Sequence, residues 1–457
     1  MTGLRVDGAR LVDAAGRPVM LRGVGLGGWM NMENFITGYP STESVMRDAL
    51  RKVMDQEAYD AFFDTFLDCF FTADDARFLA GLGLNSVRIP FGYKHFEDDS
   101  APFVLKESGF ARLDQAVEAC RAAGLWAILD LHAAPGHQGQ HWHADNPTHW
   151  ASFWEHPHFQ DRVVHLWEAL AEHYRDHPAV AAYNPLNEPG DPTGRHIEPF
   201  YRRLVAAIRA VDPDRAIFLD GNRFGTDFSA FAQPLPNVVY AVHDYAVPGF
   251  ADGGPYPGVS RGTHYDRAEI EAVLKRRTEF QRRTGTPLWV GEFGPLYTGD
   301  PVRDASRLRL LRDQLSLYQD HHAGWSLWTY KDIGLQGLVH ARPDGPYVSL
   351  ISPVLAKKER LGVDAWGGTD RHIRDEIGPL QTLFAREYPD FEPFPFGATR
   401  WFHNLVRHIL LAEPMADDFA ACFRDLTPQA ARAAASSFAL ASCEVRAPLV
   451  DALKESG

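Results

Sequence analysis

Residues 110–131 read FARLDQAVEACRAAGLWAILDL, and this stretch contains the repeating unit of the fold. The apolar residues of its first part share one helical face, at Leu113, Val117 and Cys120. Gly124 follows, in the position where glycine commonly ends a helix. The apolar run Trp126–Leu131 then predicts a buried strand. A helix followed directly by a strand is typical of a parallel sheet covered by helices.

The same alternation recurs along the chain. Eight runs are predicted strands: Met20–Gly25, Asn85–Ile89, Trp126–Leu131, Val180–Asn187, Ala216–Asp220, Val238–His243, Leu288–Glu292 and Gly324–Trp328. The helical segments between them include Phe110–Ala123, Phe159–Tyr174, Glu198–Ala210, Arg267–Arg283 and Ala305–His321. Eight such units close a (β/α)₈ TIM barrel. An open doubly wound sheet is disfavoured, because no G-x-G-x-x-G turn follows an early strand.

Two pieces fall outside the eight units. Leu4–Met20 predicts an N-terminal β-hairpin around Asp13–Gly16, placed at the bottom of the barrel. From about Trp366 the pattern is helical, over Ile373–Glu387, Trp401–Leu411 and Pro428–Ser442. We therefore expect a catalytic barrel over residues 1–365 and a helical C-terminal extension, residues 366–457, packed on it.

Composition excludes several classes of protein. Of 457 residues, 45% are hydrophobic and 23% charged, which is the balance of an ordinary globular chain. Sixty acidic against 46 basic residues give a net charge of −14, which argues against nucleic acid as a partner. No apolar run approaches the roughly 18 residues of a membrane span, so membrane insertion is not expected. The oligomeric state stays open.

The expected compartment is the cytoplasm. The opening MTGLRVDGARLVDAAGRPV has no long apolar core of the kind found in secretory signals. The four cysteines have no C-x-x-C spacing and are predicted to be buried thiols: Cys69, Cys120, Cys422 and Cys443.

Polar groups gather at the predicted strand ends. In a barrel, catalytic side chains project from the C-terminal ends of the strands. Those ends carry Arg88, His132, Asn187, Glu188, Asn222, His243, Tyr245, Glu292 and Trp328. Glu188 and Glu292 end the fourth and seventh strands, so we expect two carboxylates on opposite sides of one opening.

Cleavage of a glycosidic bond requires such a pair, one protonated and one ionised. Two glutamates at the ordinary pKa near 4.3 would leave no acid at pH 7, so the environment must separate their pKa values. Arg88 and Tyr245 are predicted to keep one carboxylate ionised, by charge and by a hydrogen bond. Burial and repulsion from the first carboxylate would raise the pKa of the other.

The motifs at these positions resemble glycoside hydrolase family 5, a retaining family of clan A. They are RGVGLGGW at 22–29, NSVRIPFGY at 85–93, LDLHAAPGHQG at 129–139, NPLNEP at 184–189, VHDY at 242–245, VGEFG at 290–294 and SLW at 326–328. The resemblance covers about residues 1–365.

The resemblance implies a part for each residue. Glu188 is the implied acid/base and Glu292 the implied nucleophile of a double displacement, with Asn187 on the sugar 2-hydroxyl. Trp328 is the implied platform under the sugar in subsite −1. The remaining implied residues support the site: Arg88, Tyr245, His132 and His243. Asn222 is a further candidate for substrate contact.

A finer likeness is to the exo-β-1,3-glucanase and β-glucosidase branch. LGGWMNMENFITGYP at 26–40 is similar to that branch's first loop, and it places Glu33 on hydroxyls of the terminal sugar. The expected activity is removal of a non-reducing terminal sugar from short glycosides, without a cofactor. Glycolipid-cleaving and furanoside-cleaving members of the family remain alternatives. The segment after the last strand, WTYKDIGLQGLVHARPDG at 328–345, departs from the branch and is expected on the leaving-group side.

The loop after the third strand and two aspartates give weaker signals. The loop HQGQHWHADNPTHW at 137–150 brings Trp142 as a candidate sugar contact, and its His141-x-His143 spacing could suit a metal, although the chemistry requires none. Asp130 is expected on the face opposite His132, as a buried partner, and Asp244 on the outward side of its strand. A sugar-binding protein without activity and a metallohydrolase using His132 and His243 are the competing functions.

Overall fold

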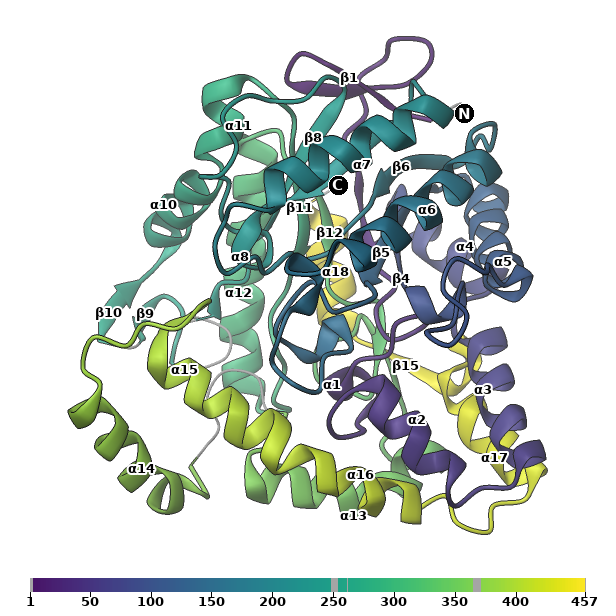
Figure 1. Ribbon diagram of the computed structural model, residues 1–457, viewed down its shortest axis with the longest axis vertical. Coiled ribbons are helices and arrows are strands. Elements are labelled where there is room, and N and C mark those ends of the chain that lie inside the picture. The colour runs from purple at the N-terminus through teal and green to yellow at the C-terminus, as the bar shows by residue number, and fades with distance from the viewer. Residues whose placement is uncertain (1–2, 248–253, 261, 365–370, 457) are drawn as a thin grey trace.

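The computed structural model describes residues 3–247, 254–260, 262–364 and 371–456. Eight parallel strands form a closed barrel in the spatial order β11-β12-β3-β4-β5-β6-β7-β8 (Figure 1). Their bounds are β3 Arg22–Gly25, β4 Ser86–Gly92, β5 Trp126–Ala133, β6 Val180–Asn184, β7 Ala216–Asp220, β8 Val238–His243, β11 Leu288–Phe293 and β12 Gly324–Leu327. The predicted TIM barrel is confirmed. Two strands differ from expectation by three residues at their C-terminal ends. Strand β4 continues to Gly92, and β6 ends at Asn184, because Pro185 follows and lacks the amide proton that a ladder needs.

Helices surround the barrel in the expected alternation. They are α3 Gln56–Phe70, α4 Ala73–Gly81, α5 Glu107–Ala123, α6 Pro157–Tyr174, α7 Ile197–Val211, α10 Arg267–Arg277, α11 Glu279–Thr284, α12 Pro301–Asp320 and α13 Pro346–Leu361. Short helices α1 Asn34–Thr37, α2 Glu43–Arg51 and α8 Asn222–Gly225 lie in loops at the C-terminal ends of the strands. The opening unit follows the sequence argument closely, since Gly124 ends α5 with a φ of 75°.

The N-terminal hairpin closes the bottom of the barrel, as expected. Strands β1 Arg5–Asp7 and β2 Arg10–Val12 pair antiparallel, so the hairpin turn lies at Gly8–Ala9, and Asp13–Gly16 forms a second turn. Leu4 donates its amide to Ala181 O and accepts from Ala216 N, which joins the hairpin to β6 and β7. The apolar bottom of the barrel consists of Leu4, Leu11, Leu21, Trp126, Ile128, Ala181, Ala182, Ala216, Phe218, Val239, Ala241 and Trp289.

The first part of the C-terminal extension lies at the opposite end of the barrel, whereas its last helix packs on α12. In Figure 1 the β1 hairpin is at the top, and α15 and α16 run along the lower edge of the view. Its elements are α14 Arg374–Glu387, α15 Gly397–Asn404, a π-helix Leu405–Leu410, α16 Ala412–Ala421, α17 Pro428–Ala435, β15 Cys443–Val445 and α18 Ala447–Glu455. The helix expected over 428–442 therefore stops at Ala435 and continues as two 3₁₀ turns.

The extension shares the hydrophobic core of the barrel. Helix α16 packs on α2 and α17 packs on α3. The ring of Phe423 lies 5.3 Å from that of Phe62, and Phe438 lies 5.0 Å from Phe66. Strand β15 pairs with β14 Val339–Ala341, which also pairs with β13 Lys331–Asp332. The boundary expected near residue 365 falls outside the described residues.

Two smaller expectations can be compared with the structure. The four cysteines are free thiols, as predicted, but the expectation that all are buried was wrong, because Cys120 is buried and the other three are partly exposed. None of the described helices has the length and apolar character needed to cross a membrane.

Candidate active site

Glu292 lies at the end of β11 and is held by two donors. Arg88, on β4, donates from Nη1 to Glu292 Oε1 at 2.6 Å. The hydroxyl of Tyr245, which follows β8, donates to Glu292 Oε2 at 2.9 Å. The strand bulges at Gly291, where an added Cβ would lie 3.0 Å from His243 Nε2. A bulge of this kind changes the direction of the next side chain, here Glu292.

Arg88 is fully buried and connects the strands that surround it. Its Nη2 donates to Asn187 Oδ1 at 2.6 Å and lies 3.1 Å from Asp130 Oδ2. Its Nε donates to Asn184 Oδ1 at 3.0 Å. Burial alone would lower the pKa of the guanidinium, but Asp130 and Glu292 raise it further than burial lowers it. Arg88 is therefore a permanent cation beneath the site.

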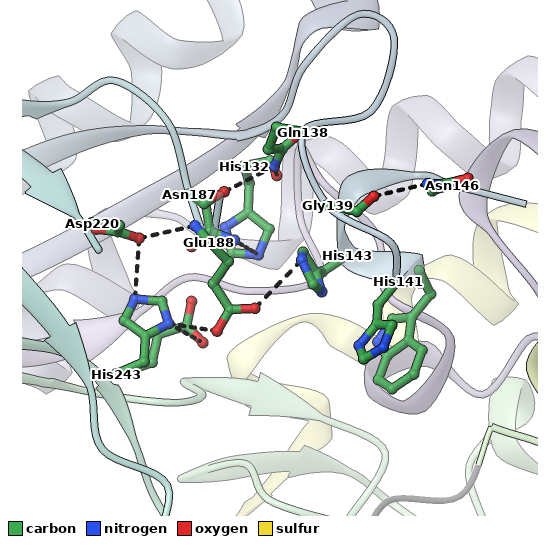
Figure 2. Close-up of polar contacts among 12 residues, drawn as sticks. His132, Gln138, Gly139, His141, His143, Asn146, Asn187, Glu188, Asp220 and His243 are labelled. Atoms are coloured by element: carbon green, nitrogen blue, oxygen red, sulfur yellow. Dashed lines mark hydrogen bonds and ion pairs between the residues drawn. The ribbon is translucent and has the colours of Figure 1, made fainter. Parts of the chain in front are cut away.

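Glu188 follows β6 in a strained backbone conformation, with a φ of 43°. Its amide donates to Asp220 Oδ2 at 3.0 Å, and Asp220 ends β7. Figure 2 shows its carboxyl group between two histidines. His243 Nδ1 is 2.6 Å from Glu188 Oε1, and His143 Nε2 is 3.4 Å from Oε2. Asp220 and His243 thus fix both the backbone and the side chain of Glu188.

The two carboxyl groups face each other closely. One oxygen of Glu188 and one of Glu292 lie within 4.8 Å of each other. His243 Nδ1 is 2.6 Å from Glu188 Oε1 and 3.5 Å from Glu292 Oε2. Burial raises the pKa of both groups, and the charge of Glu292 raises that of Glu188 further. Arg88 and Tyr245 act on Glu292 in the opposite direction and lower its pKa. Of the two, Glu188 is therefore the group that keeps its proton.

The histidines beside this pair are neutral. Burial lowers the pKa of His132 to about 4, and it lowers those of His143 and His243 well below the ordinary value. The main opposing influence on His132 is the carboxylate of Glu33. A neutral imidazole has one donor nitrogen and one acceptor nitrogen, so each of these rings can pass a hydrogen bond on.

His132 connects the site to Asp130. Its Nδ1 is 2.7 Å from Asp130 Oδ2, and its Nε2 is 3.2 Å from Asn187 Nδ2. The expectation that Asp130 lies on the face opposite His132 was wrong, because residues two apart on a strand share a face. Asp130 is nevertheless a fully buried partner, as expected. Asp244 has the outward position predicted for it and pairs with Arg277 at 2.6 Å.

Trp328 forms one side of the cavity and stacks on His132, with ring centroids 5.2 Å apart and an interplanar angle of 2°. Glycines in the 22–29 motif make room for it. A Cβ on Gly25 or on Gly27 would lie 2.5 Å from atoms of the indole. Glycine is therefore required at these two positions, because any larger residue would clash with the indole ring of Trp328.

Glu33 and Trp142 close another side. Trp142 Nε1 donates to Glu33 Oε2 at 3.1 Å. Glu33 Oε1 lies 3.4 Å from His132 Nε2 and accepts no hydrogen bond from the described residues. Burial raises the pKa of Glu33. His408, from the π-helix of the C-terminal extension, packs its ring 4.7 Å from that of Trp142.

These groups surround a cavity of about 200 Å³. It is lined by Glu33, His132, His141, Trp142, His143, Glu188, Arg223, Phe224, Thr226, His243, Tyr245, Val247, Arg277, Glu292, Trp328, Phe396 and Arg400. Arg88 and Asn187 lie beneath it, as their contacts with Glu292 and His132 require. The structure thus brings together nearly all of the residues selected at the strand ends.

Asn222 is the exception. Its Oδ1 accepts from Asp191 N at 2.9 Å and its Nδ2 donates to Asp191 O at 3.0 Å. The side chain therefore ties two loops together and does not line the cavity. Its neighbour Phe224 reaches the cavity instead, through positive φ angles at Arg223 and Phe224.

The loop after the last strand was also placed incorrectly. Residues 329–345, all of them described, contribute nothing to the lining of the cavity. Lys331 points into the core, where it donates to Asp75 Oδ1 at 2.8 Å and to the carbonyls of Phe70 and Phe438. Asp332 accepts from the amide of Gly334 at 2.7 Å. Lys331 and Asp332 thus find their hydrogen-bond partners within the protein and not in the cavity. Nothing in the sequence around them predicts these partners.

Sequence reasoning missed several residues of the site. Asp220 was read only as the last residue of a strand, although that position is where barrel site residues occur. His143 was read as a possible metal ligand. Phe396 and Arg400 come from the extension, and no pattern in the sequence connects them with the barrel mouth.

One group of residues could hold a metal ion. Among the described residues it consists of Glu188, His243 and Glu292. These are the same groups that make the carboxyl pair, and Arg88 already neutralises Glu292. The His141-x-His143 spacing does not form a ligand set, since His141 Nε2 is 2.7 Å from Asn404 Nδ2. The donor set therefore fits acid/base chemistry better than metal binding.

Comparison with known proteins decides the family. The cellulase model, described as glycosyl hydrolase family 5, matches residues 57–332. A β-xylosidase of Phanerodontia chrysosporium is 46% identical over 458 residues, which cover 97% of this chain and 96% of that protein. The chain belongs to glycosyl hydrolase family 5. It is accordingly a glycoside hydrolase, and the resemblance read from the motifs is confirmed.

Two further relatives add detail. A probable glucan 1,3-β-glucosidase A of Aspergillus niger is 33% identical over 366 residues, covering 70% of this chain and 84% of that protein. The solved structure of an endogalactoceramidase has a TM-score of 0.53 at 20% identity, over 73% of this chain and 75% of that one, which supports the fold alone. The family model ends at residue 332, whereas the match to the β-xylosidase must include most of the C-terminal extension.

Proposed function

We propose that this glycoside hydrolase is a retaining, exo-acting β-glycosidase that removes the terminal non-reducing sugar of short glycosides. The observation that carries the proposal is the carboxyl pair within 4.8 Å, with Arg88 and Tyr245 on one member only. Retaining enzymes hold their carboxyl groups about 5–5.5 Å apart, whereas inverting enzymes need about 6.5–9.5 Å to admit a water molecule.

In the first step Glu292 attacks the anomeric carbon as the glycosidic C–O bond breaks. Glu188 transfers its proton to the leaving oxygen, so the alcohol departs neutral and Glu188 becomes a carboxylate. In the second step Glu188 removes a proton from water, whose oxygen attacks the anomeric carbon and releases Glu292. Two inversions at one carbon return the β configuration.

His243 serves Glu188 in both steps. Its Nδ1 can accept from the protonated carboxyl and donate to the carboxylate, because a neutral imidazole exists in two tautomers. Its Nε2 lies 3.4 Å from Asp220 Oδ2, which provides the opposite partner. The ring therefore holds Glu188 in one place while its charge changes.

Hydrogen bonds orient Asn187 toward the sugar. Arg88 donates to its Oδ1, and its Nδ2 faces His132 Nε2, whose ring donates to Asp130 in turn. An amide nitrogen carries two protons, so one remains for the sugar 2-hydroxyl. Hydrogen bonds to this hydroxyl strengthen in the transition state.

Removal of a terminal sugar follows from the closed side of the cavity. Glu33 Oε1 can accept from sugar hydroxyls, and Trp142 and His408 lie behind it. A cavity of about 200 Å³ is small beside the roughly 300–1,000 Å³ that enclose a drug-sized ligand, which suits one sugar ring better than the middle of a polymer.

The sugar is proposed from the relatives. The near-full-length similarity to a β-xylosidase favours β-xylosides, and β-glucosides are the second choice by similarity to the glucan 1,3-β-glucosidase. The test is a panel of aryl β-glycosides followed by proton NMR of the first-formed sugar. A β-anomer appearing before mutarotation supports the proposal. An α-anomer first, or oligosaccharides released from within a polymer, would refute it.

A further inference from the structure

Four aromatic side chains form a continuous wall on one side of the cavity. We call this set the aromatic wall: Trp142, His141, Phe224 and Phe396. The rings of His141 and Trp142 are 5.3 Å apart at 7°, and those of His141 and Phe224 are 4.7 Å apart at 20°. Phe396 continues the series at 5.4 Å from Phe224 and 32°. Its outer end is accessible, since Phe396 is 50% exposed.

The aromatic wall begins at Trp142, which contacts Glu33, and its outer part lies on the acid side of the catalytic pair. His143, which approaches Glu188 Oε2 to 3.4 Å, packs edge-on against Phe224 with centroids 5.4 Å apart. The proton of Glu188 goes to the leaving oxygen, so the group attached to that oxygen must extend from Glu188 toward the mouth. Trp328, Glu33 and Asn187 belong to the sugar side.

The outer part of the wall is built by two distant segments. Arg223 Nη1 donates to Pro395 O at 3.2 Å, and its guanidinium lies 5.3 Å from the Phe394 ring. These contacts fix the extension beside α8. Arg223 and Phe224 have φ angles of 51° and 59°, a strained conformation that persists where surrounding structure imposes it. That strain turns Phe224 into the cavity.

The chemistry of this side differs from that of the sugar side. Within the described lining, the carboxylates are Glu33, Glu188 and Glu292. Glu33 and Glu292 act on the sugar and its anomeric carbon and Glu188 on the leaving oxygen, so none of them is assigned to the body of the leaving group. Arg277 is paired with Asp244. Flat rings without nearby carboxylates bind flat apolar groups better than they bind polyhydroxylated ones.

We propose that Phe224 and Phe396 bind the leaving group and that the preferred leaving group is a flat, apolar alcohol such as an aryl or arylalkyl alcohol. The inference rests on the proposed retaining mechanism, and it gives residues 366–457 a part in specificity. The C-terminal extension supplies half of the leaving-group subsite that the barrel alone lacks.

The test is the partition of the glycosyl-enzyme between two added alcohols. Both acceptors react with one intermediate, so the product ratio is independent of how the sugar binds. The alcohol oxygen attacks the anomeric carbon, its proton passes to Glu188, and Glu292 leaves as a carboxylate. With an activated aryl glycoside as donor, the ratio of 2-phenylethyl to ethyl glycoside is measured at equal acceptor concentrations.

We expect the wild type to favour 2-phenylethanol and Phe396→Ala to lower that ratio roughly three- to tenfold, the range for loss of one aromatic contact. Phe396→Trp should retain the preference. Tyr388→Ala is the matched control, because Tyr388 is 60% exposed on the same extension and does not line the cavity. Its ratio should equal that of the wild type.

An unchanged ratio in Phe396→Ala, or a wild type that favours ethanol or a sugar acceptor, would overturn the inference. Failure of the mechanism itself would look different. In that case no glycoside would be cleaved, or no transfer product with the β configuration would form from any donor and acceptor.

Discussion

The two ends of the barrel use the same strands for opposite purposes. At the bottom, Ile128 and Phe218 join an apolar layer closed by the N-terminal hairpin. Two residues further along the same inward faces, Asp130 on β5 and Asp220 on β7 are buried carboxylates. Burial raises the pKa of Asp130 to about 7 and that of Asp220 to about 6. Residues only two positions apart on one strand thus belong to a hydrophobic core in one case and to a cluster of buried carboxylates in the other.

The difference shows where stability and function are separated. Buried carboxylates are costly unless they are paired, and backbone strain is also costly, so neither would persist in a core selected only for stability. At the catalytic end Arg88 pairs with the carboxylates of Asp130 and Glu292. The apolar layer at the bottom contributes to the stability of the whole barrel. Substitutions at the catalytic end should therefore change kcat/KM, whereas substitutions at the bottom should change the free energy of unfolding.

The largest effect is expected from Glu292→Ala. Loss of the proposed nucleophile should lower kcat/KM by on the order of 10⁴–10⁶, the range seen when a nucleophile or its partner is removed from other hydrolases. Added azide should restore turnover of an activated aryl glycoside and give the α-glycosyl azide, because only one inversion then occurs. A variant with a near-normal rate would contradict the assignment.

Glu188→Gln tests the acid member of the pair. We expect a loss of about 10²–10⁴ on glycosides with poor leaving groups and much less on the first step with activated ones. The raised pKa of Glu188 places its ionisation on the alkaline limb of the pH profile, where the proton needed by the leaving oxygen is lost. In the variant the alkaline limb of kcat/KM should disappear. Its persistence would assign the acid to another group.

Leu21→Ala tests the opposite end. Leu21 is fully buried in the apolar bottom, and removal of a buried leucine side chain costs about 2–5 kcal/mol of unfolding free energy. Denaturant unfolding should show this loss, while kcat of the folded enzyme stays within about twofold. If kcat instead fell in step with stability, the two ends would not be independent.

The smallest effect is a shift in pH dependence from Asp220→Asn. The negative charge of Asp220 is one of the causes that raise the pKa of Glu188. Removing that charge should lower the pKa of Glu188 and move the alkaline limb of kcat/KM to lower pH by roughly one unit. The pH profile is the measurement, with Asp244→Asn as control, because Asp244 does not line the cavity. If the alkaline limb did not shift, Asp220 would have no influence on the pKa of Glu188, and the prediction would be wrong.

Much of this could be predicted because strand periodicity and strand ends are local properties. Eight buried runs placed Arg88, Glu188 and Glu292 at one opening without any knowledge of distances. Asn222 shows the limit of the argument, since its position at a strand end was correct but its amide bonds to Asp191. Position along a strand predicts where a residue lies, and only its neighbours decide what it contacts.

The sequence by itself determined the barrel, the family and the place of the two glutamates at strand ends, because each depends on residue types at regular spacing. Tertiary structure alone decided the rest. Barrel closure brought Arg88 to Glu292, 204 positions away, and Asp220 to Glu188. Packing of the extension carried Phe396 to the mouth of the cavity. Contacts between distant segments depend on how loops close and helices pack, and no local pattern in a single chain encodes that geometry.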